Sequence, residues 1–213
     1  MLRPGRLAVF VFLLMLVAAG PASALDVRVT EIRVAGGTIR AALEIRDMFP
    51  QKFQAVLTGG GAIHLRLQIE LWEDRSIWDK LAQPALVTVF RIVLDPDTNQ
   101  VSVSDRYGEV SRQPAWQEPL SLRLDLGRAE TLSDKARYYI RTLATLGTIA
   151  EKEATAAGDA VLGGQDSAVS LGAVSRMLFH AVLQVTDYLQ SVSVDSRTRD
   201  LTRGELMAGV RPQ

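Results

Sequence analysis

Cysteine is absent from this sequence of 213 residues, and histidine occurs only twice. The absence of cysteine excludes disulfides, thiolate metal sites and a cysteine nucleophile. It also excludes a lipoprotein, because no sulfur follows the N-terminal apolar run to accept a lipid. An exported chain without disulfides must be held together by its hydrophobic core, and this requires a domain of ordinary size.

An excess of charge of either sign is absent as well. Lys and Arg number 24, and Asp and Glu also number 24. A balanced chain lacks the basic footprint that nucleic-acid or polyanion binding requires, so we expect no nucleic-acid partner.

The sequence also has few motifs that carry chemistry. It contains no G-x-S-x-G, H-E-x-x-H, P-loop or G-x-G-x-x-G pattern. His64 and His180 have no His or Cys at metal-ligand spacing. Asp95, Asp97 and Asn99 match the start of a calcium loop, but Gln100 and Arg106 stand where its Gly and Glu are required. We therefore predict a hairpin turn at 95–100, and no metal or cofactor.

One long apolar run is present, "LAVFVFLLMLVAA" at 7–19. It follows Arg3 and Arg6 and precedes Ala22-Ser23-Ala24, the layout of a signal peptide with a small-x-small cleavage site. The run is short for a membrane span. We expect residues 1–24 to be a cleaved signal peptide and the protein to be periplasmic or secreted; the alternative is an uncleaved N-terminal anchor.

Several segments alternate apolar and polar residues with the period of a β-strand. The clearest is "AIHLRLQIELW" at 62–72, in which aliphatic residues alternate with His64, Arg66, Gln68, Glu70 and Trp72. Segment 136–149 is rich in Tyr and Thr, and β-propensity favours a strand there over a helix. The predicted strands are 26–34, 39–45, 62–72, 84–94, 101–107, 120–126 and 136–149. The first two are predicted to form a hairpin that turns at Gly36-Gly37. Segment 84–94 is apolar on nearly both faces and is predicted to be a central strand.

Together these strands predict a mainly β fold. They form antiparallel pairs with no helices of crossover length between them, so we expect an immunoglobulin-like antiparallel β-sandwich over 25–152. The apolar residues of "FPQKFQAVL" fall at helical spacing and predict a short helix near 49–58, ended by three glycines. Segment 108–119, with two prolines and a Trp, is predicted to be a loop.

The composition changes after the predicted sandwich. Residues 153–166 are rich in Ala and Gly and predict a linker. Apolar residues then recur every three or four positions, which predicts a long amphipathic helix over 167–194. Three roles are open for it: covering the sandwich, self-association, or membrane contact through 167–192. The charged segment 195–213 is expected to be a flexible tail.

The densest polar cluster is "WEDRSIWD" at 72–79. Trp and Arg are favoured at interface centres, which makes it a candidate interaction patch. The structural alternative pairs Arg75 with a nearby carboxylate and uses the two Trp rings to cap the sandwich. The candidate residues are Trp72, Glu73, Arg75, Trp78 and Asp79, together with His64 and Arg66 on the preceding strand.

A further set of residues is spread between 27 and 150, namely Phe53, Leu57, Gly61, Ile63, Glu70, Arg75, Trp78, Asp79, Phe90 and Arg91. Together they resemble the bacterial envelope family catalogued as domain of unknown function 4390. The resemblance implies an exported or membrane-anchored β-rich protein without an established activity. Some relatives are encoded near sensor kinases, which implies a link to signalling, and the family offers no catalytic residues.

The function expected from these observations is a non-enzymatic binding or interaction module of the cell envelope, whose partner is another envelope protein or a second copy. One alternative is an enzyme or enzyme accessory that acts on envelope polymers through Glu70, Glu73, Asp74 and Asp79, which would require two of them to face each other across a cleft. Another is a structural oligomer assembled through the C-terminal helix.

Overall fold

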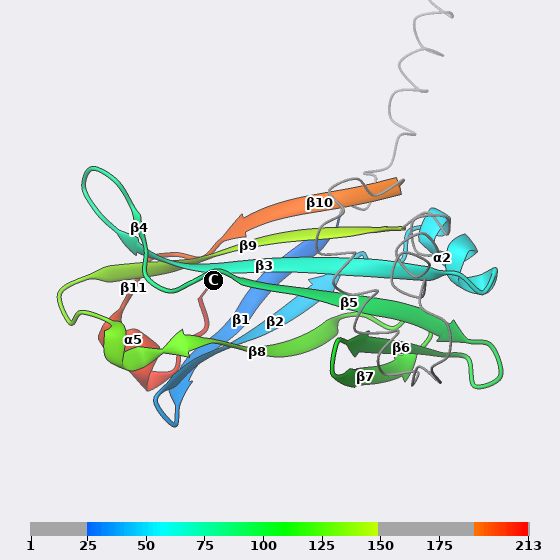
Figure 1. Ribbon diagram of the computed structural model, residues 1–213, viewed down its shortest axis with the longest axis horizontal. Helices are drawn as coiled ribbons and strands as arrows, with labels where there is room; N and C mark the ends of the chain where they lie inside the picture. The colour runs from blue at the N-terminus through cyan, green and yellow to red at the C-terminus, as the bar shows by residue number, and fades with distance from the viewer. Residues whose placement is uncertain (1–24, 149–189, 213) are drawn as a thin grey trace, which may run out of the picture.

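The computed structural model describes residues 25–148 and 190–212. These residues form two antiparallel sheets and two short α-helices (Figure 1). The elements are β1 Asp26–Ala35, β2 Thr38–Arg46, α2 Gln51–Thr58, β3 Ala62–Asp74, β4 Lys80–Leu81, β5 Leu86–Asp95, β6 Gln100–Asp105, β7 Gly108–Pro114, β8 Leu120–Arg128, η1 Ala129–Thr131, β9 Arg137–Thr148, β10 Gln190–Arg197, β11 Leu201–Thr202 and α5 Arg203–Ala208.

The small sheet has three strands in the order β1-β2-β8. β1 and β2 form the expected hairpin, which turns through Gly36 and Gly37 at φ +59° and +76°. Such angles suit glycine, because it has no Cβ to clash with the backbone. A bulge in β1 between Val29 and Glu31 bends the strand.

The large sheet has eight strands, with the order β10-β9-β3-β5-β6-β7 and with β4 and β11 attached to β3 and β9. β3 lies in its middle and pairs with β9 on one side and with β5 and β4 on the other. The aliphatic residues of β3 are buried, as its alternation predicts. The strand interpretation of 136–149 is confirmed by β9. The interior position predicted for 84–94 is confirmed only at 91–93, where β5 lies between β3 and β6.

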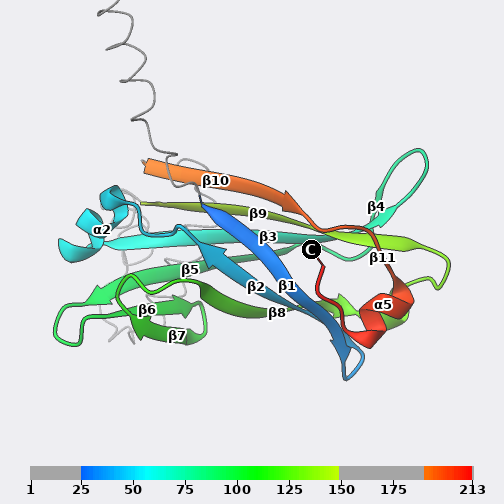
Figure 2. The same ribbon diagram turned by 180° about the vertical axis from the view of Figure 1, so that it is seen from behind.

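The two sheets bury one continuous core between them. It joins Ile39, Leu43 and Leu122 of the small sheet to Leu65 and Leu146 of the large one, all at most 5% exposed. Figures 1 and 2 show the small sheet lying across one face of the large sheet, with α2 at one end. The short helix expected near 49–58 is confirmed by α2, which buries Phe53 and Leu57.

Two expectations about the C-terminal part require correction. Residues 190–194 were assigned to a long helix but form the start of β10, because their Ser-Val alternation pairs with β9. The segment 195–213 was expected to be a flexible tail, but its described residues form the end of β10, β11 and α5. The predicted linker, residues 167–189 of the predicted helix and the signal segment lie outside the described residues.

The loop expected at 108–119 is also partly wrong. Residues 108–114 form β7, which pairs with β6 at the edge of the large sheet. Pro114 ends the strand, and a strand at a sheet edge tolerates the nearby prolines that argued against one.

The C-terminal segment is fastened to the small sheet. Thr202 and Glu205 form a reciprocal capping box at the start of α5, and Leu206 is fully buried. Val210 then exchanges two backbone hydrogen bonds of 2.9 Å with Ile32 of β1. Among the described helices, none has the length and apolar character that a membrane crossing needs.

Candidate functional site

The predicted cluster at 72–79 spans the end of β3 and the short loop that leads into β4. β3 and β4 pair through Trp72 with Leu81 and Glu73 with Lys80, and Ala82 N donates to Leu71 O at 2.8 Å. This pairing closes residues 75–79 into a loop that projects from one end of the large sheet (Figures 1 and 2). We call residues 75–79 the corner loop.

Tyr139 of β9 is the platform on which this corner is built. Its ring stacks on Trp72 with centroids 6.5 Å apart and planes 9° from parallel. The guanidinium of Arg197, from β10, lies 3.6 Å from the centroid of the same ring, which is a cation–π contact. The Tyr139 hydroxyl donates to Asp79 Oδ2 at 2.7 Å. Three strands and the corner loop therefore meet on one buried tyrosine.

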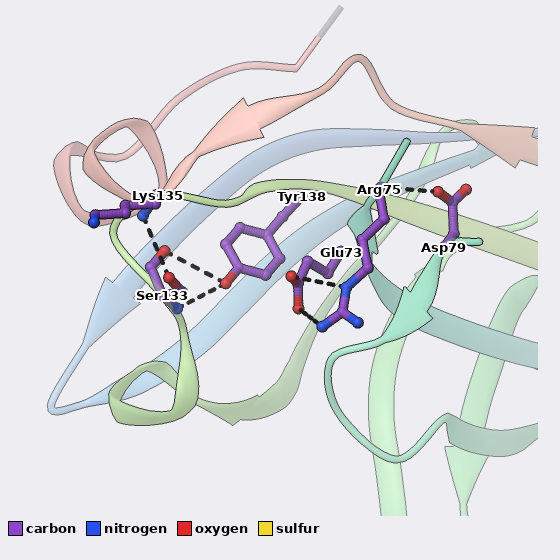
Figure 3. Close-up of polar contacts among 6 residues, drawn as sticks. All are labelled: Glu73, Arg75, Asp79, Ser133, Lys135 and Tyr138. Carbon is purple, nitrogen blue, oxygen red and sulfur yellow. Dashed lines mark hydrogen bonds and ion pairs between the residues drawn. The ribbon is translucent and has the colours of Figure 1, made fainter. Parts of the chain in front are cut away.

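Hydrogen bonds within the corner loop add to this anchor. Arg75 N donates to Asp79 Oδ1 at 3.1 Å, and the Arg75 guanidinium holds both oxygens of Glu73 at 3.0 Å (Figure 3). The predicted pairing of Arg75 with a nearby carboxylate is thus present. Beside Glu73, the hydroxyl of Tyr138, the neighbour of Tyr139 on β9, accepts a hydrogen bond from Ser133 N at 2.7 Å (Figure 3). The corner loop is fixed at both of its ends.

The apex of the corner loop carries two large apolar side chains in solvent. Ile77 is 81% exposed and Trp78 is 82% exposed. The structural interpretation, in which both Trp rings cap the sandwich, is therefore wrong for Trp78. Trp72 is half-buried and stacked, so it does serve the fold. The two tryptophans of the cluster have different roles, one structural and one displayed.

The polar face of β3 forms a ladder of side-chain hydrogen bonds. Glu70 accepts from Trp72 Nε1 at 2.8 Å and from Gln68 Nε2 at 2.6 Å, and Arg66 donates to Gln68 at 3.3 Å. His64 follows on the same face, and its burial, together with the charge of Arg91, lowers its pKa to about 4. His64 is therefore neutral at physiological pH. Eight residues separate His64 from Trp72, roughly 26 Å along a strand, so His64 and Arg66 do not join the corner.

Glu73 and Asp79 of the corner are both engaged in hydrogen bonds. The hydrogen bond from Tyr139, followed by that from Arg75 N, lowers the pKa of Asp79, and the bond from Arg75 lowers the pKa of Glu73. Glu73 and Asp74 line a shallow recess of about 350 Å³ with Ser133 and Lys135. In residues 25–148 and 190–212, no three His, Cys, Asp or Glu side chains are grouped to hold a metal ion.

Three residues of this corner were missed by sequence reasoning. Ile77 lies inside the cluster but was not singled out, although an aliphatic residue next to Trp78 in a charged loop was a usable signal. Tyr139 reaches the corner only through the register that pairs Trp72 with Tyr139. Arg197 was assigned to a flexible tail, and nothing in the local sequence indicates its position over the ring.

No family model, curated protein or solved structure matches this chain. The resemblance to the envelope family therefore stays a prediction.

Proposed function

We propose that this protein is an exported, non-enzymatic interaction module of a bacterial cell envelope and that the corner loop is its recognition element. The observation that carries the proposal is the pair Ile77 and Trp78, about four-fifths exposed on a loop that is hydrogen-bonded to the sheet. Displaying large apolar side chains in water is unfavourable, and a fixed loop cannot fold them away.

The charges around the apex favour a protein partner with an apolar recess. Glu73 and Arg75 neutralise each other, and Asp79 is held by Tyr139. At the apex, the side chains that remain available to a partner are the apolar ones of Ile77 and Trp78. Trp is among the residues that most often dominate the binding energy of an interface. A fixed loop also loses less conformational entropy on binding than a mobile one, which favours affinity.

The apex alone is too small to sustain a complex. Burying two large apolar side chains contributes roughly 1.5–3 kcal/mol each, whereas association costs about 4–15 kcal/mol. The partner must therefore also contact the rim of the corner. Lys80 and Leu81 on β4 and the recess beside Ser133 and Lys135 are exposed around it.

The compartment and biological context belong to the same proposal. The apolar run and the small-x-small triplet at the N-terminus support export, and the family resemblance supports an envelope role linked to signalling. The antiparallel two-sheet layering supports an immunoglobulin-like sandwich only at the level of layers, since a constant-type domain divides its strands four and three, whereas here they divide eight and three.

Site-specific photo-crosslinking tests the proposal. A photoreactive phenylalanine analogue replaces Trp78 in one variant and the exposed Met207 of α5, which lies outside the corner, in the control. In intact cells, position 78 is expected to crosslink one envelope protein, and position 207 is not. With that partner purified, Trp78→Ala should weaken binding at least tenfold, and Met207→Ala by less than twofold. Absent or equal crosslinking from the two positions would refute the proposal.

A further inference from the structure

The small sheet covers only part of the large one, and this leaves open edges where the two sheets diverge. One such edge lies between β5 and β8, and it forms a recess of about 400 Å³. The turn between β6 and β7, which carries Tyr107, closes one end of the recess. We call this recess the β5–β8 slot.

The backbone of β5 is unpaired along the slot. β6 begins to pair with β5 only at Arg91, and β8 pairs only with β2 among the described strands. Residues 86–90 of β5 therefore have a described neighbour, β3, on one side only. A strand edge of this kind is a template for another extended chain.

The direction of the backbone groups in β5 follows from the hydrogen bonds of its neighbour. Leu71 O of β3 accepts from Ala82 N, so the odd-numbered residues of β3 direct their backbone groups away from β9 and toward β4 and β5. Leu67 is paired with Thr88 and Ile69 with Leu86. The backbone groups of the even-numbered residues of β5 therefore form hydrogen bonds with β3.

The backbone N–H and C=O groups of the odd-numbered residues of β5 must then point away from β3. Ser104 Oγ, on β6, donates to Arg91 O at 3.4 Å, which confirms this direction further along the strand. Backbone groups alternate with period two, and the pairing of β3 with β5 has no register shift. The N–H and C=O groups of Val87 and Val89 therefore face the slot.

The slot is lined by apolar and charged side chains in similar measure. Leu86, Val87 and Leu124 provide its apolar surface, whereas the Val89 side chain is only 4% exposed. Of the lining carboxylates, Asp125 is paired with Arg40, and Asp105 accepts from Tyr107 N and Gly108 N. Arg123 is exposed and has no ion pair among the described residues. A ligand that is apolar on one face and acidic at one position complements this surface.

The molecule already binds an extended segment in this manner at its opposite open edge. Val210 forms two antiparallel backbone hydrogen bonds with Ile32 of β1, and Arg211 and Pro212 continue along the groove of about 920 Å³ beside that strand. The β5–β8 slot is the equivalent edge on the other side of the sandwich, without a described segment of the chain in it.

We propose that the β5–β8 slot binds an extended, acidic segment of a partner protein as an added strand. The peptide's backbone pairs with Val87 and Val89, its apolar side chains lie on the slot walls, and a carboxylate reaches Arg123. This site is separate from the corner loop, and it stands whether or not the corner loop binds a partner.

A peptide titration of the ¹⁵N-labelled protein tests the site. The probe is the capped hexapeptide Val-Thr-Val-Glu-Val-Thr, and the matched control has Lys in place of Glu. The amide signals of Val87 and Val89 should shift saturably with the Glu probe, and the Lys probe should bind at least fivefold more weakly. Shifts that are absent at the solubility limit, or that lie away from residues 86–89, would overturn the proposal.

Two variants separate backbone pairing from charge. Val87→Pro removes the N–H that faces the slot, and proline is tolerated at a strand edge where that group is unbonded. It should weaken the Glu probe at least tenfold, whereas Val87→Thr, which keeps the N–H, should stay within twofold. Equal binding by the two variants would contradict strand addition.

Arg123→Gln covers the case in which the proline variant does not fold. This exposed substitution should remove the preference for the Glu probe over the Lys probe without changing the shifts at Val87 and Val89. A preference that persists in Arg123→Gln, or a protein that dimerises through the slot and excludes the probe, would refute the acidic-segment assignment.

Discussion

The corner loop and the turn between β6 and β7 each expose an aromatic ring to about the same extent. Trp78 is 82% exposed and Tyr107 is 80% exposed. The difference lies in what holds them. In the corner loop, Asp79 is hydrogen-bonded to Tyr139, which is 60 residues away in the sequence. In the turn, Asp105 accepts hydrogen bonds from the backbone amides of Tyr107 and Gly108, which are its near neighbours in the sequence.

This difference shows that exposure by itself is a poor indicator of recognition. Scattered exposed apolar residues are normal on protein surfaces. The position of Trp78 is fixed by contacts with a distant strand, so a partner can recognise it. Among the described residues, only those of the turn itself fix the turn that carries Tyr107, so the position of that ring is less well defined. Substitutions in the two regions measure whether the corner loop is anchored as strongly as its contacts indicate.

The largest effect is expected from Trp72→Ala. The substitution removes the ring stacked on Tyr139 and one of the donors to Glu70, so it should lower the free energy of unfolding by about 2 kcal/mol. Tyr107→Ala should lower it by less than about 0.5 kcal/mol. Urea denaturation measures both, and similar losses in the two variants would remove the contrast between the regions.

A smaller loss is expected from Tyr139→Phe, which deletes one hydroxyl. Its hydrogen bond to the solvent-exposed Asp79 carboxylate should contribute less to the free energy of unfolding than the stacked Trp72 ring does. Amide exchange of residues 75–79 should accelerate, because the loop loses its long-range anchor. Tyr107→Phe is the matched control and should change neither quantity. Unchanged exchange in Tyr139→Phe would mean that bonds within the loop suffice.

Acid should weaken the hydrogen bond between Tyr139 and Asp79 less than removal of the Tyr139 hydroxyl does. The protonated carboxyl of Asp79 still has an oxygen that can accept a hydrogen bond. The pKa of Asp79 in the folded protein is lowered, chiefly by Tyr139. Its stabilising contribution is therefore present above the usual Asp pKa and is lost as the pH falls through the lowered value. Amide shifts of residues 75–79, followed from pH 6 to pH 2, should move with a midpoint below the usual Asp pKa.

Tyr139→Phe provides the control for that titration. Removing the hydroxyl should raise the midpoint toward the usual value for an aspartate, because the main cause of the lowered pKa is gone. A midpoint that is the same in both proteins would assign the lowered pKa to the backbone amide of Arg75 instead.

The smallest effect is expected from Arg75→Ala. The ion pair with Glu73 lies at the surface, where such pairs contribute little to stability and less still in salt. The expected loss is smaller than that of Tyr139→Phe at physiological ionic strength. A loss above that of Tyr139→Phe would show that Arg75, and not Tyr139, is the main anchor of the loop.

Much of the fold was predictable because it depends on local patterns. The alternation in 62–72 predicted β3, the two glycines after Ala35 predicted the first hairpin, and helical spacing before Gly59 predicted α2. Period and turn chemistry act over a few residues, and the sequence displays them directly. The chemistry of 72–79 likewise marked the corner before its geometry was known.

The prediction failed where distant segments decide the outcome. The Ser-Val alternation of 190–194 is short and follows an apolar repeat, and pairing with β9 makes it a strand. The sequence by itself determined the antiparallel β character, the short helix and the position of the candidate corner, since these follow from local periodicity. Only the tertiary structure decided that Trp72 is stacked while Trp78 is displayed, because the register of β3 against β9 places Tyr139 beside one ring and not the other.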